Sequence, residues 1–292
     1  MSDLLAKPTV FFVPGVGKSS IERIMTVIPK LSGNVAVKVH SGEKGNLNFL
    51  RPDYVKPLID LVNGTVVECN TAYAGARNTT KEHMKLMREH GWSSMKFDIM
   101  DSDEPDLILE SENYIEINKD YVGNHMQRYD SMLVISHFKG HPMGGYGGAL
   151  KQLSIGCASS YGKMYIHGAG DPRRMWTCDQ KKFLVAIEDA AKMVNNYCKD
   201  RGGIFYINII KNMSVDCDDI VDPEPPCMED IGILASSDPV AVDWACLDRI
   251  TSSNDPGGEK LLDRIRQKEG FYTPKAANQL GLGLLDYELV QL

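Results

Sequence analysis

The sequence predicts an α/β protein in which largely parallel sheets are flanked by helices and two lobes enclose a site between them. Apolar runs rich in β-branched and aromatic residues alternate with stretches of helical periodicity, which is the pattern of parallel strands joined by helices. The 292 residues suffice for two domains at roughly 150 residues each. A hydrophobic content of 43% with 24% charged residues is typical of a globular protein.

Short apolar runs bounded by turn residues predict strands at Thr9–Val13, Asn34–Val39, Thr65–Glu68, Met132–Ser136, Ile204–Ile210 and Ile231–Ala235. Longer amphipathic stretches predict helices at Ser20–Leu31, Pro52–Leu61, Thr80–Glu89, Gln180–Tyr197, Pro239–Ile250 and Gly258–Glu269. The helix from Gln180 has the clearest pattern, because Phe183, Ile187 and Val194 recur on one face. The acidic, alternating stretch Asp98–Asn118 predicts an inserted hairpin or edge ribbon.

A proline-rich segment marks the predicted domain boundary. Asp216–Pro226 has the sequence DCDDIVDPEPP, and its prolines cannot continue a helix or a central strand. We therefore expect a loop over 216–230 between a larger lobe, residues 1–228, and a smaller C-terminal lobe, residues 229–292. The larger lobe is expected to contain a glycine-rich loop over 140–156.

Composition excludes several function classes. The net charge of −7 argues against nucleic acid as a partner, because clustered basic charge supplies that affinity. No apolar run approaches the ~18 residues of a membrane span, and the N-terminal residues do not form a signal peptide, so we expect a cytoplasmic protein. Seven dispersed cysteines without a C-x-x-C pair argue against a disulfide framework and a self-contained zinc or ferredoxin-type site.

The N-terminal string VPGVGKSS, residues 13–20, is a near match to a phosphate-binding loop. The motif requires a glycine five residues before Gly17, and that position is Phe12. We therefore interpret the string as a plain strand-to-helix turn.

The end of the second predicted strand carries the first candidate site. Lys38, His40 and Glu43 lie at the end of this strand or just after it, and Arg51 precedes the next helix. Ligands bind at the carboxyl ends of parallel strands, so these side chains are candidates for holding an anion. The alternative is a solvated loop with a surface ion pair.

The segment 136–168 carries the densest chemistry. His137, Lys139, His141, Lys151 and His167 surround a run of glycines that follows a predicted strand. Backbone N–H groups near Gly145, Gly147 and Gly148 are candidates for cradling an anion. Histidine can ligate a metal or move a proton, and lysine can act as a nucleophile or a phosphate clamp. The alternative is a glycine-rich structural turn with satisfied surface histidines.

The segment 214–246 offers a weaker metal hypothesis. Cys217, Asp218, Asp219 and Cys227 combine thiolate and carboxylate donors, but their spacing matches no standard zinc arrangement. Asp238 precedes a proline at a predicted helix start, and we interpret it as a helix cap.

Long strings of the chain resemble a family known as domain of unknown function 362. They are VAVKVHSGEKGNLNFLRP, NTAYAGARNTTKEH, SHFKGHPMGGYGGALKQLSIGCAS, GKMYIH and DIGILASSDPVAVDWA. Members are often described as iron–sulfur centre proteins, and many carry a ferredoxin-like insert after the segment that matches GKMYIH. Here Cys178 stands alone in that region, so we expect no iron–sulfur cluster in this chain.

The run from His141 to Lys151, followed by His167, is more distantly similar to the core of nickel-pincer lactate racemases. The resemblance implies that Lys151 tethers a pyridinium-derived mononucleotide, that His167 ligates nickel and that His141 is an acid–base residue. A second acid–base histidine of those enzymes is matched here by Ala76, in the string Gly75-Ala76-Arg77, and the candidate substitutes are His83 and His137.

The leading hypothesis is an enzyme that acts on a small anionic hydroxy- or keto-acid, with a nickel-pincer-type mononucleotide or a divalent metal for hydride or proton transfer. Catalytic candidates are His141, His137 and Lys139, and the metal ligand is His167. The cofactor or substrate would be held by Lys151, Gly145, Gly147, Gly148, Lys38, Glu43, Arg51 and Arg77. Two alternatives stay open: a redox protein that works with a separate iron–sulfur partner, and a non-catalytic anion- or cofactor-binding protein. A homodimer is also left open.

Overall fold

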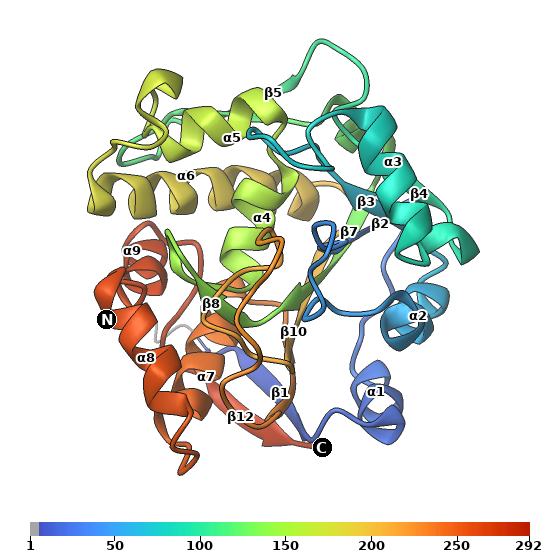
Figure 1. Ribbon diagram of the computed structural model, residues 1–292, viewed down its shortest axis with the longest axis vertical. Coiled ribbons are helices and arrows are strands. Elements are labelled where there is room, and N and C mark those ends of the chain that lie inside the picture. Colours follow the sequence, from blue (N-terminus) through green and yellow to red (C-terminus); the bar gives the residue numbers. More distant parts are fainter. Residues whose placement is uncertain (1–5) are drawn as a thin grey trace.

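Eight strands pair into one central sheet in the computed structural model, which describes residues 6–292 (Figure 1). In spatial order they are β12 (Glu288–Gln291), β1 (Thr9–Pro14), β11 (Gly232–Ser236), β10 (Ile204–Ile210), β7 (Ser131–His137), β2 (Val35–Lys38), β3 (Thr65–Glu68) and β4 (Phe97–Ile99). Only β11 is antiparallel to its neighbours, β1 and β10. The predicted α/β class with a largely parallel sheet is confirmed, and the carboxyl ends of β2, β3, β7 and β10 share one edge.

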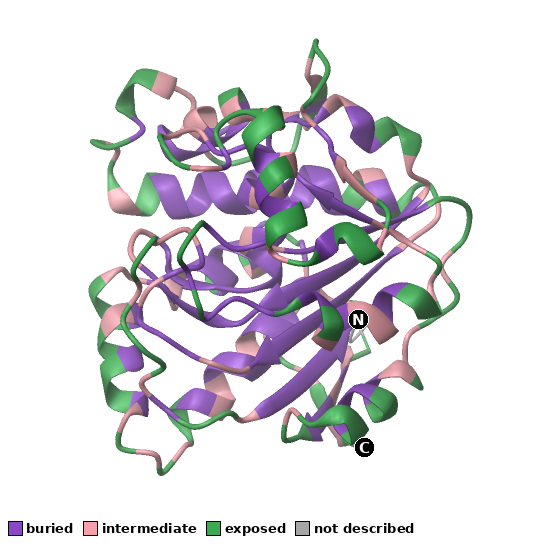
Figure 2. Cartoon of the chain, turned by 45° about the vertical axis from the view of Figure 1, so that its right-hand side comes forward, coloured by how far each residue is buried: buried purple, intermediate pink, exposed green. Residues whose placement is uncertain are grey.

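Helices cover both faces of this sheet. One face packs against α1 (Lys18–Met25), α2 (Pro52–Leu61) and α3 (Thr80–Glu89). The other packs against α4 (Ala149–Cys157), α5 (Ser160–His167), α6 (Gln180–Lys199), α7 (Pro239–Thr251), α8 (Gly258–Gln267) and α9 (Tyr272–Gln279). Alternate residues of β7 enter the two apolar cores, with Leu133 on the α1–α3 side and Met132 on the α4 side. Figure 2 shows the strands buried between helices whose outer faces are exposed.

Two small antiparallel ribbons flank the sheet, β5 (Leu107–Glu110) with β6 (Lys119–Val122) and β8 (Lys139–His141) with β9 (Gly145–Gly147). Short 3-10 helices lie at Trp92–Ser94, Asn124–Arg128 and Pro172–Arg174. The expected glycine-rich loop over 140–156 is a hairpin followed by a helix. Gly145 makes the tight turn with a φ of +83°, and the apolar residues after Gly148 bury themselves as α4.

The expected C-terminal lobe contributes to the central sheet, because β11 pairs between β1 and β10. The division into lobes at 216–230 stays a prediction. Helix α1 ends at Met25, earlier than expected, and Pro29 disfavours helical backbone in the residue before it. Within residues 6–292, no helix has the length and apolar character that a bilayer crossing requires.

Candidate functional site

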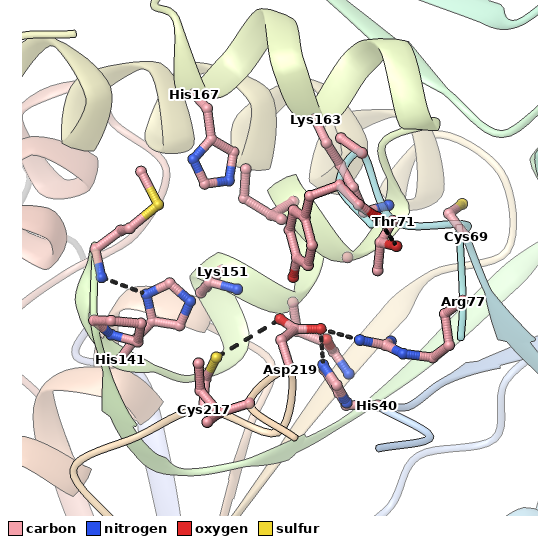
Figure 3. A pocket seen from close by; sticks show the side chains of 18 of the residues that line it. His40, Cys69, Thr71, Arg77, His141, Lys151, Lys163, His167, Cys217 and Asp219 are labelled. Atoms are coloured by element: carbon pink, nitrogen blue, oxygen red, sulfur yellow. Dashed lines mark hydrogen bonds and ion pairs between the residues drawn. The ribbon is translucent and has the colours of Figure 1, made fainter. Parts of the chain in front are cut away.

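A cavity of about 450 Å³ lies where the carboxyl ends of β2, β3 and β10 meet helices α4 and α5 (Figure 3). Ligands of α/β proteins bind at this edge of the sheet. The ionisable groups and thiols that line the cavity are Lys38, His40, Glu68, Cys69, Tyr73, Arg77, His141, Lys151, Lys163, His167, Cys217 and Asp219. The cavity therefore collects side chains from five segments that are distant in sequence.

Helical spacing aims the lysines and histidine of α4 and α5 at the cavity. Lys151 lies in the first turn of α4, and Ile155 on the same face lines the cavity as well. Lys163 and His167 are four residues apart on α5, so they share a face. The side chain of Ser159 caps α5 by accepting a hydrogen bond from the Gly162 N–H, which sets where this helix begins.

Two of the four cationic side chains that line the cavity are held by carboxylates. The Nζ of Lys38 lies 2.6 Å from Oε2 of Glu68, and both side chains are almost fully buried. The guanidinium of Arg77 faces Glu68, Asp219 and Glu43, with Nε 3.5 Å from Oε2 of Glu43. Burial alone would raise the pKa of Glu68, but Lys38 and its other cationic neighbours outweigh burial and hold that pKa well below its usual range.

The other two cations have no carboxylate partner among residues 6–292 within 4.0 Å. The ammonium of Lys163 donates to the backbone carbonyl oxygen of Ala158 at 2.5 Å. Lys151 makes no side-chain hydrogen bond to any described residue, and its Nζ faces the cavity (Figure 3). Burial lowers the pKa of Lys151. The negative charge of Asp219 acts in the opposite direction but does not outweigh burial.

His141 presents a hydrogen-bond donor to the cavity. Its Nδ1 accepts from the backbone N–H groups of Met143 at 3.1 Å and Gly144 at 2.9 Å. Burial, followed by the charge of Lys151, lowers the pKa of His141 well below 6.5, so the ring is neutral. A neutral ring whose Nδ1 accepts carries its proton on Nε2. Figure 3 shows that Nε2 points toward Cys217 and Lys151.

His167 has an unused ring nitrogen. Its Nδ1 is buried and has no hydrogen-bond partner among the described residues, while the ring stacks on Phe183 with centroids 4.7 Å apart. Burial, with a further contribution from the charge of Lys151, lowers the pKa of His167 to about 3. The other ring nitrogen, Nε2, points into the cavity in Figure 3 and is the one that a ligand can reach.

His137 and Lys139 lie beside the cavity rather than on its lining. The Nδ1 of His137 lies 3.0 Å from Asp218 Oδ1, and its Nε2 lies 2.5 Å from the carbonyl oxygen of Lys211. Both ring nitrogens of His137 therefore face oxygen acceptors inside the protein. The Nζ of Lys139 is 2.8 Å from Asp218 Oδ2. These two catalytic candidates are engaged in a buried ion cluster with Asp218.

Other predicted binding residues are also placed away from the cavity. Arg51 is exposed, donates to the Leu47 carbonyl oxygen and covers the Phe49 ring at 4.2 Å. Glu43 is buried against Arg77 and the Ala76 N–H. Gly145, Gly147 and Gly148 lie in or just after the β8–β9 hairpin, and the N–H groups that start α4, those of Ala149 and Leu150, donate to Asp243. The helix start therefore has an internal acceptor.

One group of residues in 6–292 has the spacing of a metal site: the donor atoms of His141, Cys217 and Asp219 lie within 4.8 Å of one another. The hydrogen bonds in this group oppose metal binding. A metal-ligating histidine normally donates its other N–H to an acceptor, whereas Nδ1 of His141 accepts two N–H groups. Burial raises the pKa of Cys217 to about 12, and its thiol donates to Asp219 at 3.7 Å. This donor set does not fit a divalent cation.

Several lining residues were not predicted from the sequence. Glu68 ends the predicted strand Thr65–Glu68, so its place at the sheet edge was available as a signal. Trp176 and Tyr73, whose rings are 6.2 Å apart, also border the cavity. Tyr73 lies in the string NTAYAGARNTTKEH, whereas Trp176 lies in a segment with no motif.

Comparison with known proteins gives a family and a partial structural likeness. Residues 35–248 match the family described as domain of unknown function DUF362. A lactate racemase apoprotein from Thermoanaerobacterium thermosaccharolyticum is 11% identical, with a TM-score of 0.48, over 82% of this chain and 56% of that one. A Thermotoga maritima protein is 13% identical, with a TM-score of 0.48, over 90% of this chain and 58% of that one.

This chain thus spans less than two thirds of either structure. No curated protein matches it. The family match covers most of the chain, and the chain belongs to the DUF362 family.

Proposed function

We propose that this member of the DUF362 family is an enzyme that binds a small organic anion of the hydroxy- or keto-acid class in the cavity of Figure 3. The observation that carries this proposal is the pair of lysines, Lys151 and Lys163, that face the cavity without a carboxylate partner among the described residues. A buried cation without a counter-charge is costly, and a bound anion removes that cost.

The charge balance of the lining supports an anion. Four cationic side chains face the cavity against two carboxylates, those of Glu68 and Asp219. Burial lowers the pKa values of the three lining histidines, His40, His141 and His167, so they add no positive charge at neutral pH. The lining thus has a net positive charge that a singly or doubly charged acid can neutralise.

The hydrogen-bonding groups suit a carboxylate next to an oxygenated carbon. Lys163 is anchored by Ala158, so it can offer a fixed charge to the carboxylate. The Nε2–H of His141 can donate to the hydroxyl or keto oxygen, in the way a neutral imidazole polarises a carbonyl. The Nε2 of His167, which points into the cavity in Figure 3, can accept a proton from the ligand, and a bound anion raises its basicity by opposing the charge of Lys151.

Calorimetric titration at neutral pH with lactate, pyruvate and glyoxylate tests the proposal, with the methyl ester of pyruvate as the uncharged control. The acids are expected to bind and the ester to bind far more weakly. Lys163→Met should weaken acid binding by about tenfold or more, since hydrogen bonds to charged groups contribute roughly 1.5–3 kcal/mol. Lys182→Met, at an exposed lysine of α6, is the matched control. Equal heats for acid and ester, or no binding of any acid, would contradict the proposal.

A second candidate function rests on the covalent attachment of a cofactor to Lys151, which the resemblance to nickel-pincer lactate racemases implies. Lys151 and His167 line one cavity and both lack hydrogen-bond partners at the atoms concerned, which fits a lysine that holds a pyridinium-derived mononucleotide and a histidine that ligates its nickel. Such a group would supply hydride transfer.

The intact mass and elemental content of the natively purified protein separate the two candidates. A covalent addition with nickel supports the second, and an unmodified chain that binds acids supports the first. Stoichiometric iron with sulfide would contradict both and favour the electron-transfer alternative.

A further inference from the structure

We propose that Lys151 is a covalent nucleophile whose amine forms an imine with the carbonyl carbon of a 2-oxo acid. This inference rests on the proposed function, because the acid is taken to occupy the same cavity. It adds the substrate class, the 2-oxo acids, and the reacting atom, Nζ of Lys151.

Lys151 is half-buried, and it differs from the buried lysines near the cavity in having no partner. Lys38 is held by Glu68 at 2.6 Å, Lys139 by Asp218 at 2.8 Å and Lys163 by the Ala158 carbonyl oxygen at 2.5 Å. For Lys151 the described residues supply neither a carboxylate within 4.0 Å nor a side-chain hydrogen bond. A partly desolvated ammonium without a counter-charge loses its proton more readily than a paired one, and the neutral amine that results is the nucleophilic form of lysine.

The surroundings of Lys151 supply the other parts of the reaction. The Nε2–H of His141 points toward the same part of the cavity and can donate to the keto oxygen (Figure 3). Lys163 offers a charge for the carboxylate from the neighbouring helix. The cavity volume of about 450 Å³ leaves ample room for a small acid.

A second, smaller chamber lined in part by Lys151 can hold the water molecule that imine formation releases and hydrolysis consumes. It has a volume of about 20 Å³, and its lining includes Lys151, Gln152, Ser136, His40, His137 and Lys139. The Oγ of Ser136 is buried and has no partner among the described residues. A polar chamber holds one water molecule when its volume exceeds roughly 10–15 Å³. Ser136 Oγ therefore marks a water position next to the amine.

The step is balanced without an oxidant or a reductant. The Nζ lone pair attacks the carbonyl carbon, the carbonyl oxygen takes up a proton, and a carbinolamine forms. Loss of that oxygen as water, with the two protons of the amine, leaves a carbon–nitrogen double bond to Lys151. Hydrolysis reverses the step.

Trapping with sodium borohydride tests the proposal on the intact natively purified protein. Pyruvate and borohydride together should add the mass of the acid less one oxygen atom to one site per chain, and peptide mapping should locate it at Lys151. Lactate with borohydride should add nothing, because it has no carbonyl. Lys151→Arg, which keeps the charge, should lose the adduct, whereas Lys182→Arg at an exposed lysine should keep it.

The outcomes separate this inference from the proposed function. Pyruvate binding without any adduct, or an adduct on Lys38 or Lys163 instead, would overturn the imine and leave anion binding standing. Absence of binding by every acid would overturn both. The location of the adduct in the wild-type protein decides the matter even if Lys151→Arg folds poorly.

Discussion

Two lysine–histidine sets near the cavity differ in one respect. His137 and Lys139 share the carboxylate of Asp218, and the second ring nitrogen of His137 faces the Lys211 carbonyl oxygen. Lys151 and His167 face the cavity, and their functional nitrogens have no carboxylate partner. The residue types are the same, so the carboxylate decides which set is structural and which is available for chemistry. A buried charge is retained beside a counter-charge and is disfavoured without one.

Removing the shared carboxylate should have the largest effect. Asp218→Asn leaves Lys139 buried without a counter-charge and removes the carboxylate that contacts His137, so we expect a loss of about 3–5 kcal/mol in the free energy of unfolding. Urea unfolding at neutral pH measures it. Asp222→Asn, at an exposed carboxylate of the same loop, is the control and should change stability little. A loss as small as that of the control would show that the cluster is not held by Asp218.

The stability of the folded chain should depend on pH through His167, which lines the cavity. The pKa of His167 is about 3 in the folded chain against 6.5 ordinarily, so the unfolded chain binds a proton between these values and the folded chain does not. Stability is therefore lost as pH falls from 6.5 toward 3. His167→Phe should abolish this share, up to about 1.4 kcal/mol for each pH unit in that window. Parallel stability profiles of the two proteins would contradict a buried neutral His167.

Replacing the unpartnered lysine should cost no stability. Lys151→Met fills similar space and removes an amine that burial disfavours, so we expect the free energy of unfolding to rise by about 1 kcal/mol or stay unchanged. The comparison is Lys139→Met, which removes a partner of Asp218 and should destabilise the chain. A large loss for Lys151→Met would indicate a structural contact for this lysine.

A substitution in the near match to a phosphate-binding loop, residues 13–20, should change neither stability nor the response to ATP. Lys18 opens α1 with a side chain that is 90% exposed, outside both cavities described. Lys18→Ala should leave stability within about 0.5 kcal/mol of wild type, as is usual for surface substitutions. ATP should raise the melting temperature of neither protein. A stabilisation by ATP that depends on Lys18 would show that Phe12 does not exclude a phosphate loop.

Local pattern predicted most of the sheet and several helices. The strands Thr65–Glu68 and Ile204–Ile210 and the helices Pro52–Leu61 and Thr80–Glu89 have the predicted bounds, because turn residues and periodicity mark their ends. Helix α4 was missed, since its glycine-rich start resembles a loop. Its first N–H groups are accepted by Asp243, a residue of α7 that no local signal connects to it.

For the site, the sequence predicted which segments of the chain line the cavity, but it did not predict which of their side chains are held by internal partners. Lys38, Arg77, His141, Lys151 and His167 do line one cavity. His137 and Lys139 do not line this cavity because they contact Asp218. Asp218 is distant from them in sequence, so this ion cluster has no local signature. Arg51 begins α2 and turns back onto Phe49, which spacing alone does not reveal. The catalytic roles and the identity of the ligand stay predictions.

One calorimetric titration compares the two lysine sets directly. Pyruvate is titrated at neutral pH into wild type, Lys151→Met and Lys139→Met, each checked for a folded state by circular dichroism. If the unpartnered set is the functional one, Lys151→Met loses pyruvate binding while Lys139→Met retains it, since Lys139 is held by Asp218 outside the main cavity. Retained binding in Lys151→Met together with lost binding in Lys139→Met would contradict the assignment.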